Sequence, residues 1–226
     1  MPREARTVSS TRLRRTAVVV AFAALALTGC SASQAGAASI VGGQTVTDSQ
    51  VAELANEVQA QLSTISGVTY DEKAATVASL TSQTRHLILD AVAEKEGITV
   101  TQGEVDVFVQ NIVDTQFSGK REALVQNLVS QSNVPESQVS RAARDQLIYN
   151  ALIAKVASGA TTDEAKAKAF SDYMKTFTAE IGVQVAARFG TWNVFALGPV
   201  PDDLSFVPTP ASSGAGRPIT LPNPGS

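Results

Sequence analysis

The chain has 226 residues, and the 197 residues after an expected leader suit one domain with flexible ends, or at most one and a half. Hydrophobic residues make up 44% of the chain and aromatic residues only 5%, so we expect a core of Val, Leu, Ile and Ala, a composition that favours helices. The net charge is −3, and −7 without the leader, which carries five arginines and one glutamate. This balance argues against nucleic-acid binding, because phosphate contacts need a clustered basic surface.

Residues 1–29 have the order of a secretory signal peptide. A basic region with Arg12, Arg14 and Arg15 precedes eleven apolar residues, 17–27, and small residues follow. Eleven residues rise about 16 Å as a helix, roughly half of a bilayer core, so a permanent membrane span is disfavoured. A twin-arginine export signal at Arg14–Arg15 is an alternative, although the flanking residues match that signal poorly.

The leader ends at Leu27-Thr28-Gly29-Cys30, which contains the only cysteine of the chain. These four residues resemble the lipobox of bacterial lipoproteins, which implies cleavage between Gly29 and Cys30 and lipidation of Cys30. The alternatives are an ordinary signal peptide with a chance cysteine, or a buried apolar thiol. A lone thiol cannot form an intramolecular disulfide, whereas acylation would anchor the protein to the cell membrane on its extracytoplasmic face. Whether that is an inner or an outer membrane stays open.

Residues 30–39 consist of small residues without an apolar period, so we expect a flexible tether. A short β-type run with the glycine pair Gly42-Gly43 follows and leads into a helix. Thr47 and Gln50 have the spacing of a capping box, and apolar residues then fall on one helical face up to Ile65.

Five further helices are expected. The first covers Asp71 to Glu96 and stops at Gly97. The second follows a capping pattern at Thr101 and Glu104 and ends at Ser118-Gly119. The third lies around Leu124–Val129. A long helix spans Glu136 to Ala157, whose wide apolar arc indicates a central helix, and the last begins with a capping box at Thr161 and Glu164 and reaches Ile181.

The sequence contains no catalytic constellation. His86, the only histidine, has Asp90 one helical turn later, but no nucleophile motif accompanies this pair, so a solvated i,i+4 contact is the favoured interpretation. We expect no metal site, because one histidine and a committed cysteine supply too few ligands, and no cofactor, because no phosphate-loop motif occurs. The carboxylates at Asp71-Glu72, Glu94–Glu96 and Asp202-Asp203 are expected to be solvated.

Aromatic side chains could line a groove for unfolded polypeptide or fill the core, and core packing is the favoured interpretation. The residues concerned are Phe108, Phe117, Tyr149, Phe170, Tyr173 and Phe177. Substrate-binding residues therefore stay unknown from the sequence. Trp192 is expected to anchor the last strand on the bundle.

The start at Ile40–Thr47, the segment Gly97–Thr101 and the terminal segment Gly182–Trp192 resemble the SurA-like chaperone module of bacterial foldases, of the trigger factor, SurA and PrsA type. The terminal segment keeps Arg188, Phe189, Gly190 and Trp192 of the family pattern, whereas Ala186-Ala187 replace Asn-Pro. The resemblance implies a mainly α fold over residues 40–196, a bundle of about six helices in which Ile40-Val41 pair with Val183–Val185 as two short strands.

The larger foldases carry a parvulin prolyl isomerase domain before the final helix. Here Ser158–Thr162 fill that place, and five residues cannot hold such a domain. The resemblance therefore implies a chaperone-like lipoprotein, not an enzyme, that binds unfolded or newly exported proteins without ATP. The alternative is a structural or accessory envelope lipoprotein that binds one dedicated protein partner. The oligomeric state stays unknown.

Residues 197–226 form the last expected segment. Seven of the nine prolines fall between Pro199 and Pro224 among Ser, Gly and Thr, without an apolar period. We expect a disordered or polyproline-like tail.

Overall fold

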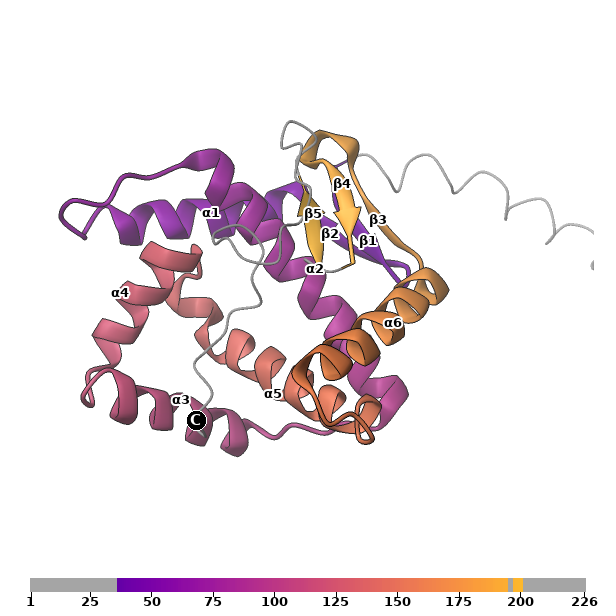
Figure 1. Ribbon diagram of the computed structural model, residues 1–226. Coiled ribbons are helices and arrows are strands. Elements are labelled where there is room, and N and C mark those ends of the chain that lie inside the picture. The colour runs from indigo at the N-terminus through magenta and orange to yellow at the C-terminus, as the bar shows by residue number, and fades with distance from the viewer. Residues whose placement is uncertain (1–35, 195–196, 201–226) are drawn as a thin grey trace, which may run out of the picture. The chain divides into compact units, whose positions relative to one another are not determined.

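The computed structural model describes residues 36–194 and 197–200, and Figure 1 shows the elements that they form. By their contacts the residues divide into two units, Met1–Gly36 and Ala37–Ser226, and the description below concerns the second. The expected signal peptide, Cys30 and residues 201–226 of the expected tail lie outside the described residues.

The described part of the chain is mainly helical, and its six α-helices and short antiparallel strands confirm the predicted fold class. In chain order the elements are β1 Ala37–Val41, β2 Gln44–Thr47, α1 Asp48–Leu62, α2 Glu72–Glu96, α3 Gln102–Gln116, α4 Arg121–Ser132, the 3₁₀ turn η1 Glu136–Gln138, α5 Val139–Val156, α6 Asp163–Ile181, β3 Val183–Val185, the 3₁₀ turn η2 Ala187–Phe189, β4 Thr191–Asn193 and β5 Gly198–Val200. Within the described residues, no helix combines the length and the apolar character that crossing a membrane requires.

The helix starts that the sequence predicts at Thr47 and Thr101 are present as capping boxes. The Thr47 hydroxyl accepts from the Gln50 amide at 3.2 Å, and the Thr47 amide donates to Gln50 Oε1 at 2.8 Å. Thr101 and Glu104 repeat this arrangement with distances of 3.3 and 2.7 Å. Each box satisfies helical amides that have no partner within the helix, so both starts are fixed locally.

Two predicted helix starts differ from the structure. The segment after Pro135 begins with η1, and the α-helical geometry of α5 starts only at Val139. The N-cap of α6 is Thr162, whose hydroxyl accepts from the Ala165 amide at 3.2 Å, so the predicted capping box of Thr161 with Glu164 is wrong by one residue. A hydroxyl caps whichever amide its backbone position reaches, and two adjacent threonines leave that choice open.

The predicted pairing of the two ends of the domain is confirmed. β1 pairs antiparallel with β3, and Ile40 lies opposite Gln184 and Val41 opposite Val183. The sheet is larger than predicted, because β2 covers the other edge of β1 and gives the order β2-β1-β3. Gly42 and Gly43 join β1 to β2 with φ of 56° and 84°, the positive values that a two-residue hairpin turn needs. Residues 37–39, predicted as part of the tether, belong to β1.

The predicted start of the tail at residue 197 also needs correction. Leu197 is buried, and Gly198–Val200 form β5, which pairs with β4 in a second, two-stranded sheet. Trp192 of β4 lies opposite Pro199 and packs against the cluster that contains Met174 and Phe177. Trp192 therefore anchors this sheet on the helices, as predicted. The segment carries no periodic apolar pattern, so the sequence offers no sign of this strand.

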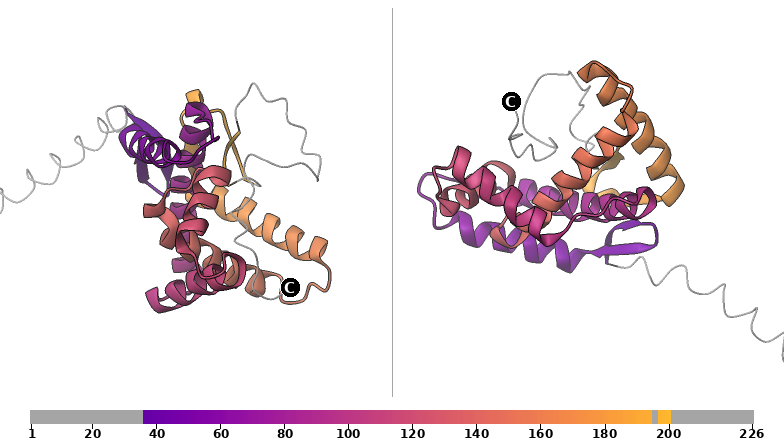
Figure 2. Two further views of the ribbon diagram at one scale, coloured as in Figure 1. Left: turned by 90° about the vertical axis from the view of Figure 1, so that its left-hand side faces the viewer. Right: turned by 90° about the horizontal axis from the view of Figure 1, so that it is seen from below.

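Helix α2 occupies the centre of the folded unit (Figures 1 and 2). It contacts α1, α5, β1, β2 and β5, and α5 in turn contacts α3 and α6. One apolar cluster lies among α3, α4 and α5 and includes Phe108, and a second joins α2, α5, α6 and the sheets and includes Phe177. Phe117, Phe170 and Tyr173 pack against the same clusters, so these aromatic side chains belong to the core.

Replacing Gly198 by alanine is expected to destabilise the fold. A Cβ atom there would lie 2.5 Å from Cγ2 and 2.7 Å from Oγ1 of Thr81 on α2. Overpacking of this kind costs about 1–3 kcal/mol, which urea unfolding would measure as a lower free energy of unfolding. Gly198→Ala combined with Thr81→Ala should recover most of the loss. Gly159→Ala is the matched control, because a Cβ atom at Gly159 meets nothing within 4 Å. Equal losses at the two glycines would contradict the close approach of β5 to α2.

Candidate functional site

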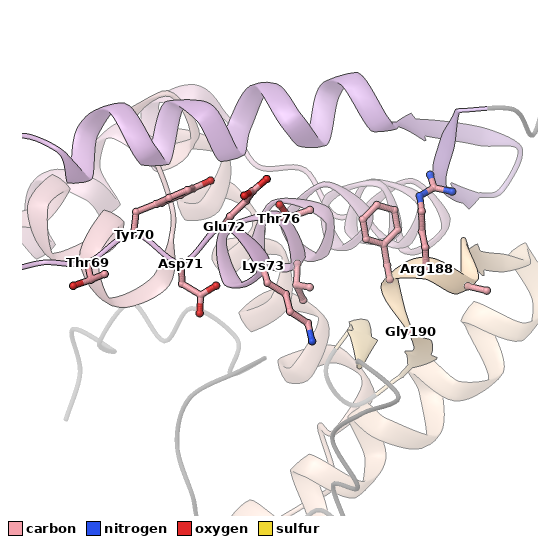
Figure 3. A pocket seen from close by; sticks show the side chains of 11 residues that line it. Thr69, Tyr70, Asp71, Glu72, Lys73, Thr76, Arg188 and Gly190 are labelled. Carbon is pink, nitrogen blue, oxygen red and sulfur yellow. The ribbon is translucent and has the colours of Figure 1, made fainter.

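A groove lies between the start of α2 and the segment that connects β3 to β4 (Figure 3). We call it the α2–η2 groove. One wall consists of residues 69–73 with Thr76 and Val77, and the other consists of residues 187–190. Its volume is about 950 Å³, within the usual range of sites that bind small ligands.

The α2 wall is held by contacts of two neighbouring side chains. Asp71 is the N-cap of α2, and its Oδ1 accepts from the Ala74 amide at 2.9 Å. Tyr70 packs against the apolar cluster that joins α1, α2 and α4. Its hydroxyl donates to the Ala55 carbonyl oxygen of α1 at 3.4 Å. Burial raises the pKa of the Tyr70 phenol, and the charges of Glu72 and Asp71 add to this effect. Tyr70 is therefore a neutral side chain that lines the groove.

The opposite wall is fixed to the first sheet by Arg188 and Phe189. Arg188 Nη2 donates to the Ala37 carbonyl oxygen at 3.1 Å and forms an ion pair with Asp48. The guanidinium carbon lies 4.8 Å from the centroid of the Phe189 ring, a cation–π contact. Phe189 also packs against the buried cluster around Val46 and Val51, so the side chain is held in place before anything binds.

The groove combines aromatic surface with charges of both signs. Asp71 and Glu72 are anionic, whereas Lys73 and Arg188 are cationic, and Figure 3 shows Asp71 and Lys73 extending from the start of α2 on the same side. The lining residues include no cysteine, serine or histidine that could form a nucleophile and base pair. Such a surface suits non-covalent binding of a chain that offers apolar groups and a few charges.

The residues of this groove stand out in the sequence, but nothing there indicates that they form one site. Asp71-Glu72 are at the predicted helix end, and Arg188, Phe189 and Gly190 carry the family resemblance, but the two segments are more than 100 residues apart. The predicted lipidation and cleavage residues, Cys30 and Gly29, lie outside the described residues. Across residues 36–194 and 197–200, no cluster of three or more His, Cys, Asp or Glu side chains could hold a metal ion.

The predicted i,i+4 contact of His86 with Asp90 is present, but His86 is buried, so the prediction that it is solvated is wrong. Its side chain is 5% exposed, with Nδ1 2.7 Å from Oδ1 of Asp145 on α5 and Nε2 3.1 Å from Oδ2 of Asp90. Arg144 of α5 forms a further ion pair with Asp90. An imidazole ring donates from both nitrogens when it carries two protons, so one side chain can join two carboxylates here. The cluster connects α2 with α5 inside the fold.

Arg85 and Tyr149 extend this polar contact between α2 and α5. Burial lowers the pKa of the Arg85 guanidinium, and the nearby charges of Asp145 and Tyr149 oppose that change. Burial likewise raises the pKa of the Tyr149 phenol, and the positive charge of Arg85 acts in the opposite direction. Tyr149 packs edge-on against Phe170 of α6, with ring centroids 4.7 Å apart. These groups therefore contribute to the packing of α5 on α2 and α6.

Glu96 at the end of α2 also has structural partners instead of the predicted solvated position. Its side chain lies 2.8 Å from Lys155 Nζ of α5 and accepts from the Tyr173 hydroxyl of α6 at 2.8 Å. The hydrogen bond from Lys155, followed by that from Tyr173, lowers the pKa of the Glu96 carboxyl. Burial, together with the hydrogen bond to Glu96, raises the pKa of the Tyr173 phenol. One carboxylate thus joins three helices.

The coupling between His86 and Asp145 can be measured by a double-mutant cycle. We expect His86→Ala to lower the free energy of unfolding by about 3 kcal/mol, because the buried Asp145 carboxylate loses the ring that faces it. The cycle of His86→Ala with Asp145→Ala should give a coupling energy of about 1–3 kcal/mol. Lys168 and Asp172, an exposed i,i+4 ion pair on α6, form the control cycle with about 0.3–0.5 kcal/mol. A coupling no larger than this control would contradict the buried pair.

Comparison with known proteins identifies the family. No curated protein and no solved structure matches the chain. Residues 9–157 match the sequence model of the SurA-like N-terminal domain, a range that includes the first sheet's β1 and β2 and helices α1 to α5 and ends one residue after α5. Since this match covers well over half of the chain, the protein belongs to the family of the SurA-like N-terminal domain.

Proposed function

We propose that this protein is a membrane-anchored extracytoplasmic lipoprotein whose helical domain binds unfolded or newly exported polypeptides without ATP. The observation that carries the proposal is the family match over residues 9–157, because the SurA-like module is a chaperone-type fold. Family membership is an argument by analogy, so the binding itself needs a direct test.

The α2–η2 groove supports polypeptide binding over small-molecule chemistry. Tyr70 and Phe189 offer apolar faces that attract side chains without fixed direction, and this suits many different sequences. Lys73 and Glu72 add charges of opposite sign, which accept either sign on a bound chain. Neither wall carries a nucleotide-binding loop, which agrees with binding that needs no ATP.

The connection between α5 and α6 supports a chaperone module without prolyl isomerase activity. α5 ends at Val156 and α6 begins at Asp163, so a short turn occupies the place where larger foldases carry a parvulin domain. A catalytic domain needs a sheet and core of its own, and this turn cannot supply them. We therefore propose a binding protein and not an enzyme.

Residues 27–30 support an anchor at the membrane. The sequence Leu27-Thr28-Gly29-Cys30 after an apolar run is the pattern at which lipidation of Cys30 would occur. Two or three acyl chains bind a bilayer firmly, since each buried CH₂ group contributes about 0.8 kcal/mol. A lipid-anchored domain would meet exported chains where they emerge from the membrane.

A second candidate function is binding of one dedicated protein partner in the cell envelope. The observation that favours it is the scarcity of exposed apolar surface. Within the described residues, Val107 is the one large hydrophobic residue that is exposed, and Phe108 and Phe177 are buried in the core. Chaperones that accept many clients generally need a larger apolar patch, whereas a dedicated partner can be recognised by polar and charged contacts.

Client binding can be tested by aggregation of a chemically denatured protein. A soluble form that begins at Ser31 is expected to reduce light scattering by the client at several-fold molar excess. Tyr70→Ala with Phe189→Ala should weaken this effect, and Val107→Ala, an exposed position outside the groove, should not. Absence of suppression would refute the chaperone proposal. Cross-linking in cells then separates the two candidates, because one stoichiometric partner would favour the dedicated function and a broad set would favour the chaperone.

The anchor can be tested by metabolic labelling with a fatty acid analogue. The wild-type protein is expected to take up the label and to enter the detergent phase on phase separation, and Cys30→Ser should abolish both. Because Cys30 is the only cysteine of the chain, a lipid attached through a thioether bond can be located only at this residue. Label retained by Cys30→Ser, or absent from the wild type, would contradict lipidation at this residue.

A further inference from the structure

The register of the second sheet places the end of β5 beside the α2–η2 groove. β4 and β5 are antiparallel, and Val200, the last described residue, lies opposite Thr191. Thr191 follows Gly190, which lines the groove. In an antiparallel pair the two strands run in opposite directions, so β5 points from Asn193 toward Thr191 and Gly190. Val200, the end of β5, therefore lies beside the segment that lines one wall of the groove.

The position of β5 is fixed by close packing. Gly198 approaches Thr81 of α2 so closely that a Cβ atom would lie 2.5 Å from the threonine side chain, and Leu197 is 4% exposed. Thr81 lies one helical turn after Val77, a lining residue of the groove on the same face of α2. One turn of helix is about 5.4 Å long, so the start of β5 is packed on α2 about one turn away from the groove wall.

The segment that follows is long enough and has suitable chemistry. Residues 201–210 read Pro-Asp-Asp-Leu-Ser-Phe-Val-Pro-Thr-Pro. Ten residues in a polyproline conformation extend about 30 Å, and the α2 wall from residue 69 to 77 would extend only about 12 Å at the helical rise. Proline-rich segments bind grooves lined by aromatic rings, which Tyr70 and Phe189 provide here. The carboxylates of Asp202 and Asp203 would meet a surface that carries Arg188 and Lys73 as well as Asp71 and Glu72.

We propose that residues 201–210 bind in the α2–η2 groove of the same chain. The contact is independent of the client binding proposed above, because it concerns only two segments of this protein. Since a tethered segment has an effective concentration in the millimolar range, any other chain must compete with it for the groove. The segment would then act as a built-in competitor that sets how tightly the groove binds external polypeptides.

Disulfide trapping in the full chain tests this contact. In a Cys30→Ser background, Thr76→Cys is paired with Ser205→Cys, and the control pairs Val107→Cys on α3 with the same Ser205→Cys. We expect the groove pair to oxidise at least tenfold faster than the control pair, measured by mass spectrometry under mild oxidant. Adding Phe189→Ala should slow the groove pair several-fold. Circular dichroism confirms that each variant is folded.

A competition measurement gives an independent result. A fluorescent peptide with the sequence of residues 201–210 is titrated with the full chain and with a variant that carries Phe206→Ser, Pro208→Ser and Pro210→Ser in its own tail. We expect the variant to bind the peptide at least tenfold more tightly, and to lose that gain on Phe189→Ala. Equal oxidation of the two cysteine pairs, or equal peptide binding by the two chains, would overturn the proposal. If it fails in this way while client aggregation is still suppressed, the proposed function stands without the tail contact.

Discussion

The burial of α2 on several sides is the constraint on which the rest of the structure depends. Its buried residues include Leu80, Ile88, Leu89 and Val92, and they face α1, α5 and both sheets. A polar side chain on the enclosed faces of this helix is stabilised by a partner on a neighbouring helix. His86 and Glu96 have such partners on α5 and α6, and the groove forms where the start of α2 leaves the enclosed region. Core, polar contacts and candidate site are thus consequences of one packing arrangement.

Features fixed by nearby residues could be predicted from the sequence. The capping boxes at Thr47 and Thr101 and the stop at Gly97 depend on residues within one turn, and the structure has them as predicted. The pairing of β1 with β3 was predictable for a different reason, because the resemblance of both ends to a known module supplied the long-range information. Where two equivalent capping residues are adjacent, as at Thr161 and Thr162, the local sequence does not decide which one is the N-cap, and the structure has Thr162.

Features that depend on distant packing could not be predicted. His86 is polar and lies on a helix with many polar neighbours, so its burial follows only from Asp145, 59 residues later. The groove needs two segments from opposite ends of the domain, and β5 forms because Gly198 lets the backbone approach Thr81, with no alternating apolar pattern to indicate a strand. In each case the decisive partner is fixed by the tertiary fold, and a single sequence does not record it.

The central position of β1 has a consequence for the order of folding. One of its neighbours, β2, follows after a two-residue turn, whereas the other, β3, is synthesised about 140 residues later. Closing so long a loop has an entropic cost, which opposes the pairing of β1 with β3. In addition, the chain is synthesised from its N-terminus, so β1 and β2 are present before β3. The hairpin and the helices can therefore form first, and pairing of β3 with β1 follows as a late step, once α6 has been synthesised. Until then, one edge of β1 stays open for pairing.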